Sequence, residues 1–213
     1  MDYDLESIDY ILQTTRSVRK RLDLESPVDE KVVTECLKIA LQAPTGSNAQ
    51  GWKFLVVTDK EKIAKIGEFY KKSFSAYYAS GSPPKKVDPA QQKRVTDSAS
   101  YLANHMGEVP MLIFACVKGR ATDSALAAGL YGSIIPAAWS LMIALRARGI
   151  GSAWTTLHLS YERECNEILG IPDYITTAVM LPVAYFTGET FKKAKRLPLK
   201  DVVYWDSWGN SKS

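Results

Sequence analysis

Stretches with apolar residues at helical spacing alternate along this chain with short runs that are almost wholly apolar. An apolar residue at every third or fourth position is typical of an amphipathic helix, whereas a short run rich in β-branched and aromatic residues is typical of a buried strand. We expect helices around residue 10 and at 29–43, 59–78, 90–106, 123–148 and 161–169, and strands at 52–58, 110–117, 150–156 and 176–186. The pattern predicts a folded globular domain that contains both helices and strands.

Prolines interrupt three of these stretches. Residues 123–148 are apolar on all sides, which predicts a buried helix, and Pro136 should kink it or begin a second helix. Pro182 cannot donate a ladder hydrogen bond, so we expect an edge strand or a bulge there. Residues 70–89 end in a proline-rich break and are expected to form a mobile excursion that acts as a lid.

The segment 43–52, with the sequence APTGSNAQGW, joins a predicted helix to a predicted strand. It combines small, turn-forming and amide-bearing residues, so many of its hydrogen-bonding groups lie outside regular structure. This composition indicates a recognition loop.

The charge balance argues against a dedicated nucleic-acid binder. The 213 residues carry 27 Lys and Arg against 23 Asp and Glu, a net charge of +4 with the two signs interleaved. Basic residues nevertheless cluster at 16–21 and at 192–196. The first cluster is explained either by a solvated basic surface or by an anion cradle, in which Arg side chains and the Ser17 hydroxyl hold phosphate oxygens.

The sequence shows no sign of a metal site or a targeting segment. Cys36, Cys116 and Cys165 are an odd count without metal-ligand spacing, which favours reduced thiols. The first residues are acidic, and no apolar run approaches the roughly 20 residues of a membrane span. We therefore expect a cytoplasmic protein without a metal or a membrane contact.

No familiar catalytic apparatus is present in the sequence. It lacks a nucleophile elbow, a Walker loop and a dinucleotide fingerprint. His158 has no carboxylate or cysteine near it at ligand spacing, so we expect it to be structural. An enzyme of this composition must take its chemistry from a cofactor.

Four motifs, in this order and spacing, resemble those of the FMN-dependent nitroreductase family. They are Arg16-Ser17-Val18-Arg19, residues 43–52, Gly149-Ile150-Gly151-Ser152 and Lys195-Arg196-Leu197-Pro198. The resemblance covers most of the chain. It implies an α+β fold of one domain over residues 1–213, nitroreductase-like and three-layered (α/β/α), with a central mixed, mainly antiparallel sheet.

The resemblance also implies an obligate homodimer with FMN at the interface. Residues 125–145 would then form the dimer core. The aromatic residues near the C-terminus need a surface to dock on, so residues 199–213 are expected to lie against the partner subunit.

The resemblance further implies which residues bind the cofactor. Arg16 would lie on the phosphate or ribityl side of FMN, and Ser17 beside it. Arg19 would lie at the pyrimidine end, where a cation stabilises the reduced flavin. Loop residues from the other subunit would complete the site: Thr45, Gly46, Ser47, Asn48 and Gln50.

The end of the third predicted strand matches the position beside the flavin N5. A backbone N–H of Trp154, Thr155 or Thr156 would there prepare N5 for hydride transfer. Lys195 and Arg196 match the family's phosphate clamp.

The sequence departs from the family pattern at three places. Thr15 stands where many relatives have a basic residue, so we expect one phosphate or ribityl contact to be missing. Thr156-Leu157 replaces a Glu-Gly pair of one branch, so we expect a pocket polarity and an acceptor preference that differ from that branch. Ala194 occupies the position of the clamp's first lysine, which leaves Lys193 or Lys195 to replace it.

We expect a flavin oxidoreductase with a ping-pong cycle, in which NAD(P)H passes hydride to flavin N5 and a nitroaromatic, quinone or similar acceptor is then reduced. Reductive dehalogenation, ene reduction or flavin breakdown are the alternatives within the family. A non-enzymatic basic binding module is the alternative outside it. The sequence leaves open the acceptor, the choice between NADH and NADPH, and the behaviour towards oxygen.

Overall fold

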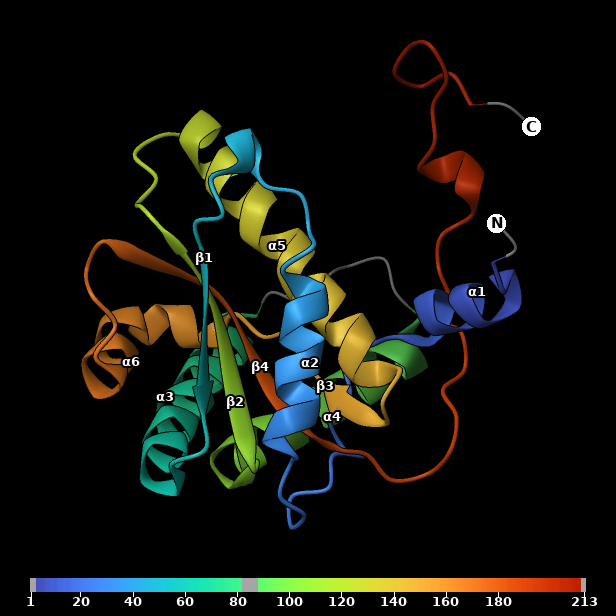
Figure 1. The fold of residues 1–213 in the computed structure, drawn as a ribbon. Coiled ribbons are helices and arrows are strands. Elements are labelled where there is room, and N and C mark those ends of the chain that lie inside the picture. Colours follow the sequence, from blue (N-terminus) through green and yellow to red (C-terminus); the bar gives the residue numbers. More distant parts are fainter. Residues whose placement is uncertain (1–2, 82–87, 212–213) are drawn as a thin grey trace. The chain divides into compact units, whose positions relative to one another are not determined.

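The computed structural model describes residues 3–81 and 88–211 of the chain. These residues form two compact units, one of residues 1–14 with 189–213 and one of residues 15–188, and each is described by itself. The larger unit contains a four-stranded sheet with helices packed on it (Figure 1). The predicted α+β class is confirmed.

The sheet of the larger unit is antiparallel. Its strands β1 (Trp52–Val57), β2 (Met111–Lys118), β3 (Ile150–Ser152) and β4 (Ile175–Tyr185) lie in the order β1-β2-β4-β3. Every neighbouring pair is antiparallel, so the described residues contain no parallel pair. β2 and β4 are central and buried on both faces, as their continuous apolar sequences require.

Helices cover both faces of the sheet. α2 (Glu30–Ala40) and α5 (Ser124–Arg146) share a core with alternate residues of β2, such as Met111 and Ile113, which therefore point to one face. On the other face the ring of Phe114 lies 5.5 Å from that of His158, in the turn η3 (Leu157–Tyr161). α3 (Lys60–Ala79) packs on η3, on α4 (Pro89–His105), on α6 (Glu162–Leu169) and on the turn η2 (Met106–Glu108).

Four of these helices begin at an aspartate. The carboxylates of Asp29, Asp59, Asp88 and Asp123 accept backbone N–H groups of the first turns of α2, α3, α4 and α5. Such caps satisfy donors that have no partner inside the helix, so these helix starts can be read from the sequence. Of the predicted lid at 70–89, residues 70–79 belong to α3. Residues 82–87 lie outside the described part of the chain, so the lid stays a prediction.

The proline predictions hold only in part. α5 continues through Pro136 as one helix, so Pro136 does not begin a second helix, and a kink at Pro136 stays a prediction. Pro182 lies in β4, which is a central strand, and the bulge of β4 is not at Pro182 but at Ala178, which is skipped where Ala115 pairs with Val179 and Cys116 with Thr177. The carbonyl of Pro182 accepts from Ala153 at 3.3 Å, beyond the last residue of β3, so its missing N–H falls where the short β3 ladder has already ended.

One face of α5 is more exposed than its sequence predicts. Leu126, Ile135 and Trp139 are 46%, 42% and 38% exposed, whereas another face, with Ile134, Leu141 and Leu145, packs on α2 and the sheet. By length and composition alone, the 23 residues of α5 are long and apolar enough to cross a membrane. This corrects the expectation, drawn from the sequence, of no apolar stretch of that length. The core that α5 forms with α2 and the sheet is that of a globular domain.

The smaller unit consists of α1 (Leu5–Thr14) and the C-terminal segment with the turn η4 (Leu199–Asp201). Near the C-terminus the chain turns back, with Trp205 N donating to Asn210 O at 2.7 Å. The ring of Tyr204 lies 4.8 Å from that of Trp208, which is 91% exposed. Docking of residues 199–213 on a partner subunit stays a prediction.

Gly67 of α3 lies directly against the backbone of η2. A Cβ at this position would lie 2.5 Å from Gly107 N and 2.6 Å from its Cα. We expect Gly67→Ala to lower the free energy of unfolding by about 1–3 kcal/mol, because the backbones must move apart. Chemical denaturation measures this, with the exposed Lys71→Ala on the same helix as the control. An effect of Gly67→Ala no larger than that of the control would contradict the close packing.

His158 is fully buried, and neither ring nitrogen has a hydrogen-bond partner in the described part of the chain. Burial lowers the pKa of His158 to about 4. The unfolded chain, with a histidine pKa of about 6.5, therefore binds the proton first, so stability is full above about pH 6.5 and falls towards pH 4 by up to ~3 kcal/mol.

Replacement of His158 should remove this acid sensitivity. We expect the free energy of unfolding of His158→Leu to fall less between pH 7 and pH 4, on the order of 3 kcal/mol less, than that of the wild type. Urea denaturation at several pH values measures the difference. His105→Gln, at the surface histidine that bonds Glu108, is the control. Parallel pH profiles of wild type and His158→Leu would exclude the histidine as the cause.

Candidate functional site

Residues 16–19 run beside the end of β3. Val18 N–H donates to Ser152 O at 2.8 Å, and Trp154 N–H donates to the Ser17 hydroxyl oxygen at 3.2 Å. The two segments are far apart in the sequence. For the part of the cofactor site that one subunit supplies, the sequence predicts three groups of residues, at 16–19, 154–156 and 195–196. The structure brings the first two groups together.

The glycines of the Gly-Ile-Gly-Ser motif allow this contact. Gly149 has φ of 74°, a left-handed conformation that turns the chain from α5 into β3. A Cβ on Gly151 would lie 3.2 Å from Cβ of Val18 and 3.1 Å from Leu22. The segment could not approach β3 as closely if residue 151 had a side chain.

The backbone N–H groups of residues 154–156 differ in what they bind. Trp154 donates to Ser17, and Thr155 donates to Met180 O at 3.2 Å. The Thr155 hydroxyl also donates to Met180 O, and this side chain is buried. Thr156 is exposed, and its N–H has no partner within the described residues. Of the three predicted residues, Thr156 is therefore the one that offers a donor to a ligand.

Arg19 is half-buried close to the tyrosines of α3. Burial lowers the pKa of its guanidinium. Tyr70 and Tyr78 oppose this shift, and Arg16 adds to it. Burial raises the pKa of Tyr70 to about 12, and Arg19 opposes that shift. None of the groups that act on Arg19 is a carboxylate, so a negative charge from a ligand would be stabilised here.

Arg21 points away from this place. Its guanidinium carbon lies 5.5 Å from the centroid of the Phe186 ring, and that of Arg146 lies 5.0 Å from the same ring. The Nε of Arg21 donates to Thr187 O at 2.5 Å. Arg21 thus holds the chain after β4, as a structural cation.

The loop 43–52 has a strained backbone and exposed side chains. Ser47, Asn48 and Gln50 have φ of 51°, 52° and 49°, which is uncommon for residues other than glycine. Gln50 donates to the Asn48 side chain at 3.1 Å. Strain of this kind concentrates at binding sites, because it persists only where the surrounding structure enforces it. The turn η1 (Gly46–Asn48) contacts α5.

The loop and residues 154–156 lie at opposite edges of the sheet (Figure 1). The loop leads into β1, and residues 154–156 follow β3, three strand spacings or about 14 Å away. Thr155 pairs with Met180 opposite Phe114, whereas β1 begins opposite Val117, about 10 Å further along β2. Within one chain, these predicted residues do not converge.

Other predicted residues belong to the smaller unit. Lys195 and Arg196 are exposed in the C-terminal segment, and their part in a phosphate clamp stays a prediction. Tyr70 was not predicted as a site residue, because at helical spacing it looks like an ordinary core position of α3. Its phenol beside a cation from another segment could be found only from the structure.

Comparisons with known proteins identify the family of the chain. The model of the nitroreductase family matches residues 12–185. An iodotyrosine deiodinase of Thermotoga neapolitana is 29% identical over 179 residues, which cover 83% of this chain and 87% of that protein. A putative NADH dehydrogenase/NAD(P)H nitroreductase of Archaeoglobus fulgidus is 26% identical over 201 residues, covering 93% and 97%.

A solved structure has the same fold. It is a crystal structure of oxidized iodotyrosine deiodinase bound to FMN and 3-iodo-L-tyrosine, with a TM-score of 0.69 and 22% identity, and it covers 91% of this chain and 96% of that one. Because the family model spans most of the sequence and the fold agrees with it, this chain belongs to the nitroreductase family.

Proposed function

We propose that this protein is an FMN-dependent oxidoreductase that takes electrons from NAD(P)H and reduces a nitroaromatic, quinone or similar small acceptor. The observation that carries the proposal is the meeting of residues 16–19 with residues 154–156. A half-buried cation, a hydroxyl and an unpartnered backbone N–H lie there together. Family membership, and the FMN bound to the iodotyrosine deiodinase of the same fold, support it.

The residues of this place fit the groups of FMN. Arg19 would donate to the pyrimidine end of the ring, and Arg16 to the ribityl or phosphate side. Ser17 accepts from Trp154, which leaves its own hydroxyl hydrogen for the ligand. The N–H of Thr156 would donate to ring N5. Bound FMN would supply the redox chemistry that the side chains lack, so the protein's part is positioning and electrostatics.

We propose that a second copy of the chain completes the site. The loop residues Thr45 to Gln50 and Thr156 belong to opposite edges of the sheet, so they do not converge on one place within one chain. α5 also presents an exposed face of small and apolar residues at helical spacing. This face consists of Ala125, Ala128, Gly129, Gly132, Ile135 and Trp139. It would let the same helix of a partner approach closely.

The end of α3 is our candidate for one wall of the acceptor site. Phe74 and Tyr78 have ring centroids 4.4 Å apart, and Tyr77 meets Tyr78 at 5.3 Å. Tyr78 also acts on the charge of Arg19. Flat aromatic side chains next to the cofactor cation suit a flat, electron-poor acceptor.

Reductive dehalogenation of an aromatic substrate is the second candidate. The specific observation in its favour is that proteins named iodotyrosine deiodinase match this chain at a sequence identity similar to that of proteins named nitroreductase. Steady-state assays of the FMN-loaded protein with nitroaromatics, quinones and halophenols distinguish the two activities. Turnover of halophenols alone would favour the second candidate.

Charge at position 19 should control the cofactor. We expect the purified protein to be yellow and Arg19→Ala to bind FMN about 10- to 100-fold more weakly, since a charge-assisted hydrogen bond is lost. Arg21→Ala is the matched control and should retain FMN, because Arg21 contacts Phe186. Fluorescence titration with FMN measures both. Equal losses in the two variants would contradict the placement, and a colourless wild type that takes up no FMN would contradict the function.

Assembly should depend on the exposed face of α5. A Cβ on Gly132 would meet nothing within 4 Å in the single chain, so we expect Gly132→Arg to fold but to dissociate the dimer and to lose FMN with it. Analytical ultracentrifugation with absorbance at the flavin band reports both. Asn104→Arg, exposed on α4, is the control. A Gly132→Arg monomer with its full FMN content would show that each site is complete in one chain.

A further inference from the structure

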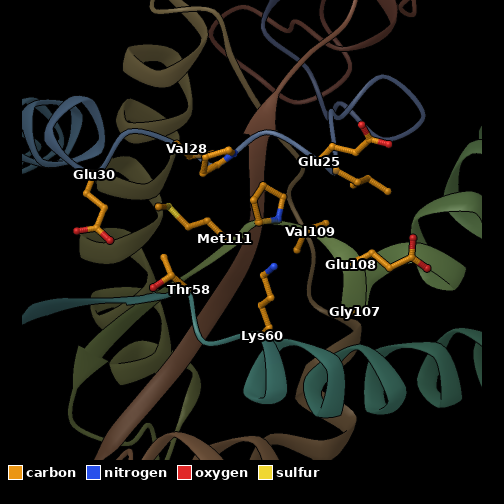
Figure 2. A pocket seen from close by; sticks show the side chains of 12 residues that line it. Glu25, Val28, Glu30, Thr58, Lys60, Gly107, Glu108, Val109 and Met111 are labelled. Atoms are coloured by element: carbon orange, nitrogen blue, oxygen red, sulfur yellow. The ribbon is translucent and has the colours of Figure 1, made fainter.

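A cavity of about 460 Å³ lies in the larger unit, and none of the residues predicted to bind the cofactor lines it. Its walls come from the segment before α2, the junction of β1 with α3, and the segment between η2 and β2 (Figure 2). Its volume is within the range of small-molecule sites. It shares no residue with 16–19, 43–52 or 154–156.

The floor of this cavity is apolar and belongs to the core. Val28, Val109 and Met111 are 8%, 3% and 1% exposed, so their positions are fixed by packing. Pro27 and Pro110 add rigid apolar surface. A ligand with an apolar part would gain mainly from covering Leu24, Pro27 and Pro110, which line the same cavity and still have exposed surface.

Groups of both charges stand around the floor. Figure 2 shows Lys60 rising in the middle with its amine directed into the cavity, Glu30 to one side, and Glu25 and Glu108 to the other. Glu108 bonds His105 at 2.8 Å. Lys60, Glu25 and Glu30 take part in no ion pair among the described residues, although they line one cavity.

This arrangement discriminates between ligands by charge. A simple anion could meet Lys60 but would be repelled by the carboxylates, and a simple cation would meet the carboxylates but be repelled by Lys60. A molecule with one group of each sign satisfies both, and the hydroxyl of Thr58 on the wall offers a further hydrogen bond to a carboxylate.

We propose that this cavity binds a small zwitterion with an apolar side chain, which is the chemistry of a free hydrophobic α-amino acid. Lys60 would hold its carboxylate and Glu30 its ammonium group, and the apolar lining residues Leu24, Pro27 and Pro110 would contact its side chain. The proposal is independent of the flavin function, because the cavity shares no residue with the cofactor site.

Isothermal titration calorimetry of the chain of 213 residues tests this, with L-phenylalanine as the probe. We expect saturable binding at one site per chain. The single-charge analogues 2-phenylethylamine and 3-phenylpropionate should bind at least about tenfold more weakly. No saturable heat up to about 10 mM phenylalanine, or equal binding of either analogue, would overturn the proposal.

Two conservative variants locate the site. Lys60→Gln and Glu30→Gln should each weaken phenylalanine binding by about tenfold or more, while Lys53→Gln, at an exposed lysine outside the cavity, should not. Thermal unfolding checks that each variant is folded. Phenylalanine binding that survives in Lys60→Gln, or that is lost in Arg19→Ala instead, would assign the ligand to another place and refute the proposal.

Discussion

The arrangement of the candidate site depends on the pairing of residues 17–23 with the edge of the sheet. Val18 bonds Ser152, Trp154 bonds Ser17, and Asp23 N donates to Tyr185 O at 2.8 Å, so this segment continues the sheet beyond its last short strand. The pairing fixes where the cations that follow one another in the sequence point. Arg19 is directed to the tyrosines of α3 and Arg21 to Phe186, because the chain turns between them, with Leu22 N–H donating to Arg19 O at 3.2 Å. One backbone pairing thus separates a cation suited to a ligand from a cation that supports the fold.

Much of the fold could be predicted from the sequence, because local signals decide it. Aspartate caps mark four helix starts, and continuous apolar runs mark the two central strands. The failures concern properties set by neighbours. Pro182 looked like an edge residue, and only the early end of β3 explains how a central strand accepts it. The exposure of Trp139 could not be predicted, since an apolar helix has the same sequence whether its face is covered by its own chain or by another.

The candidate site could be predicted as a set of motifs but not as a geometry. The sequence grouped Ser17 with Trp154, and the structure brings them into contact. It could not tell that the Thr155 side chain bonds Met180, which leaves Thr156 as the donor, or that Tyr70 lies near Arg19. Nor could spacing along the chain show that the loop 43–52 lies at the other edge of the sheet. That separation, together with the exposed face of α5, is the physical basis for assigning the loop to the site of a second copy.

Subunit complementation tests this shared site most directly. One chain would carry Arg19→Ala and keep its loop, and a differently tagged chain would carry Asn48→Ala with Gln50→Ala and keep its arginine. Each variant alone should form dimers that bind FMN poorly. In the purified mixed dimer, one site would combine the intact arginine of one chain with the intact loop of the other, so the account predicts about half of the wild-type FMN content. A mixed dimer as empty as its parents would contradict a site built from two chains.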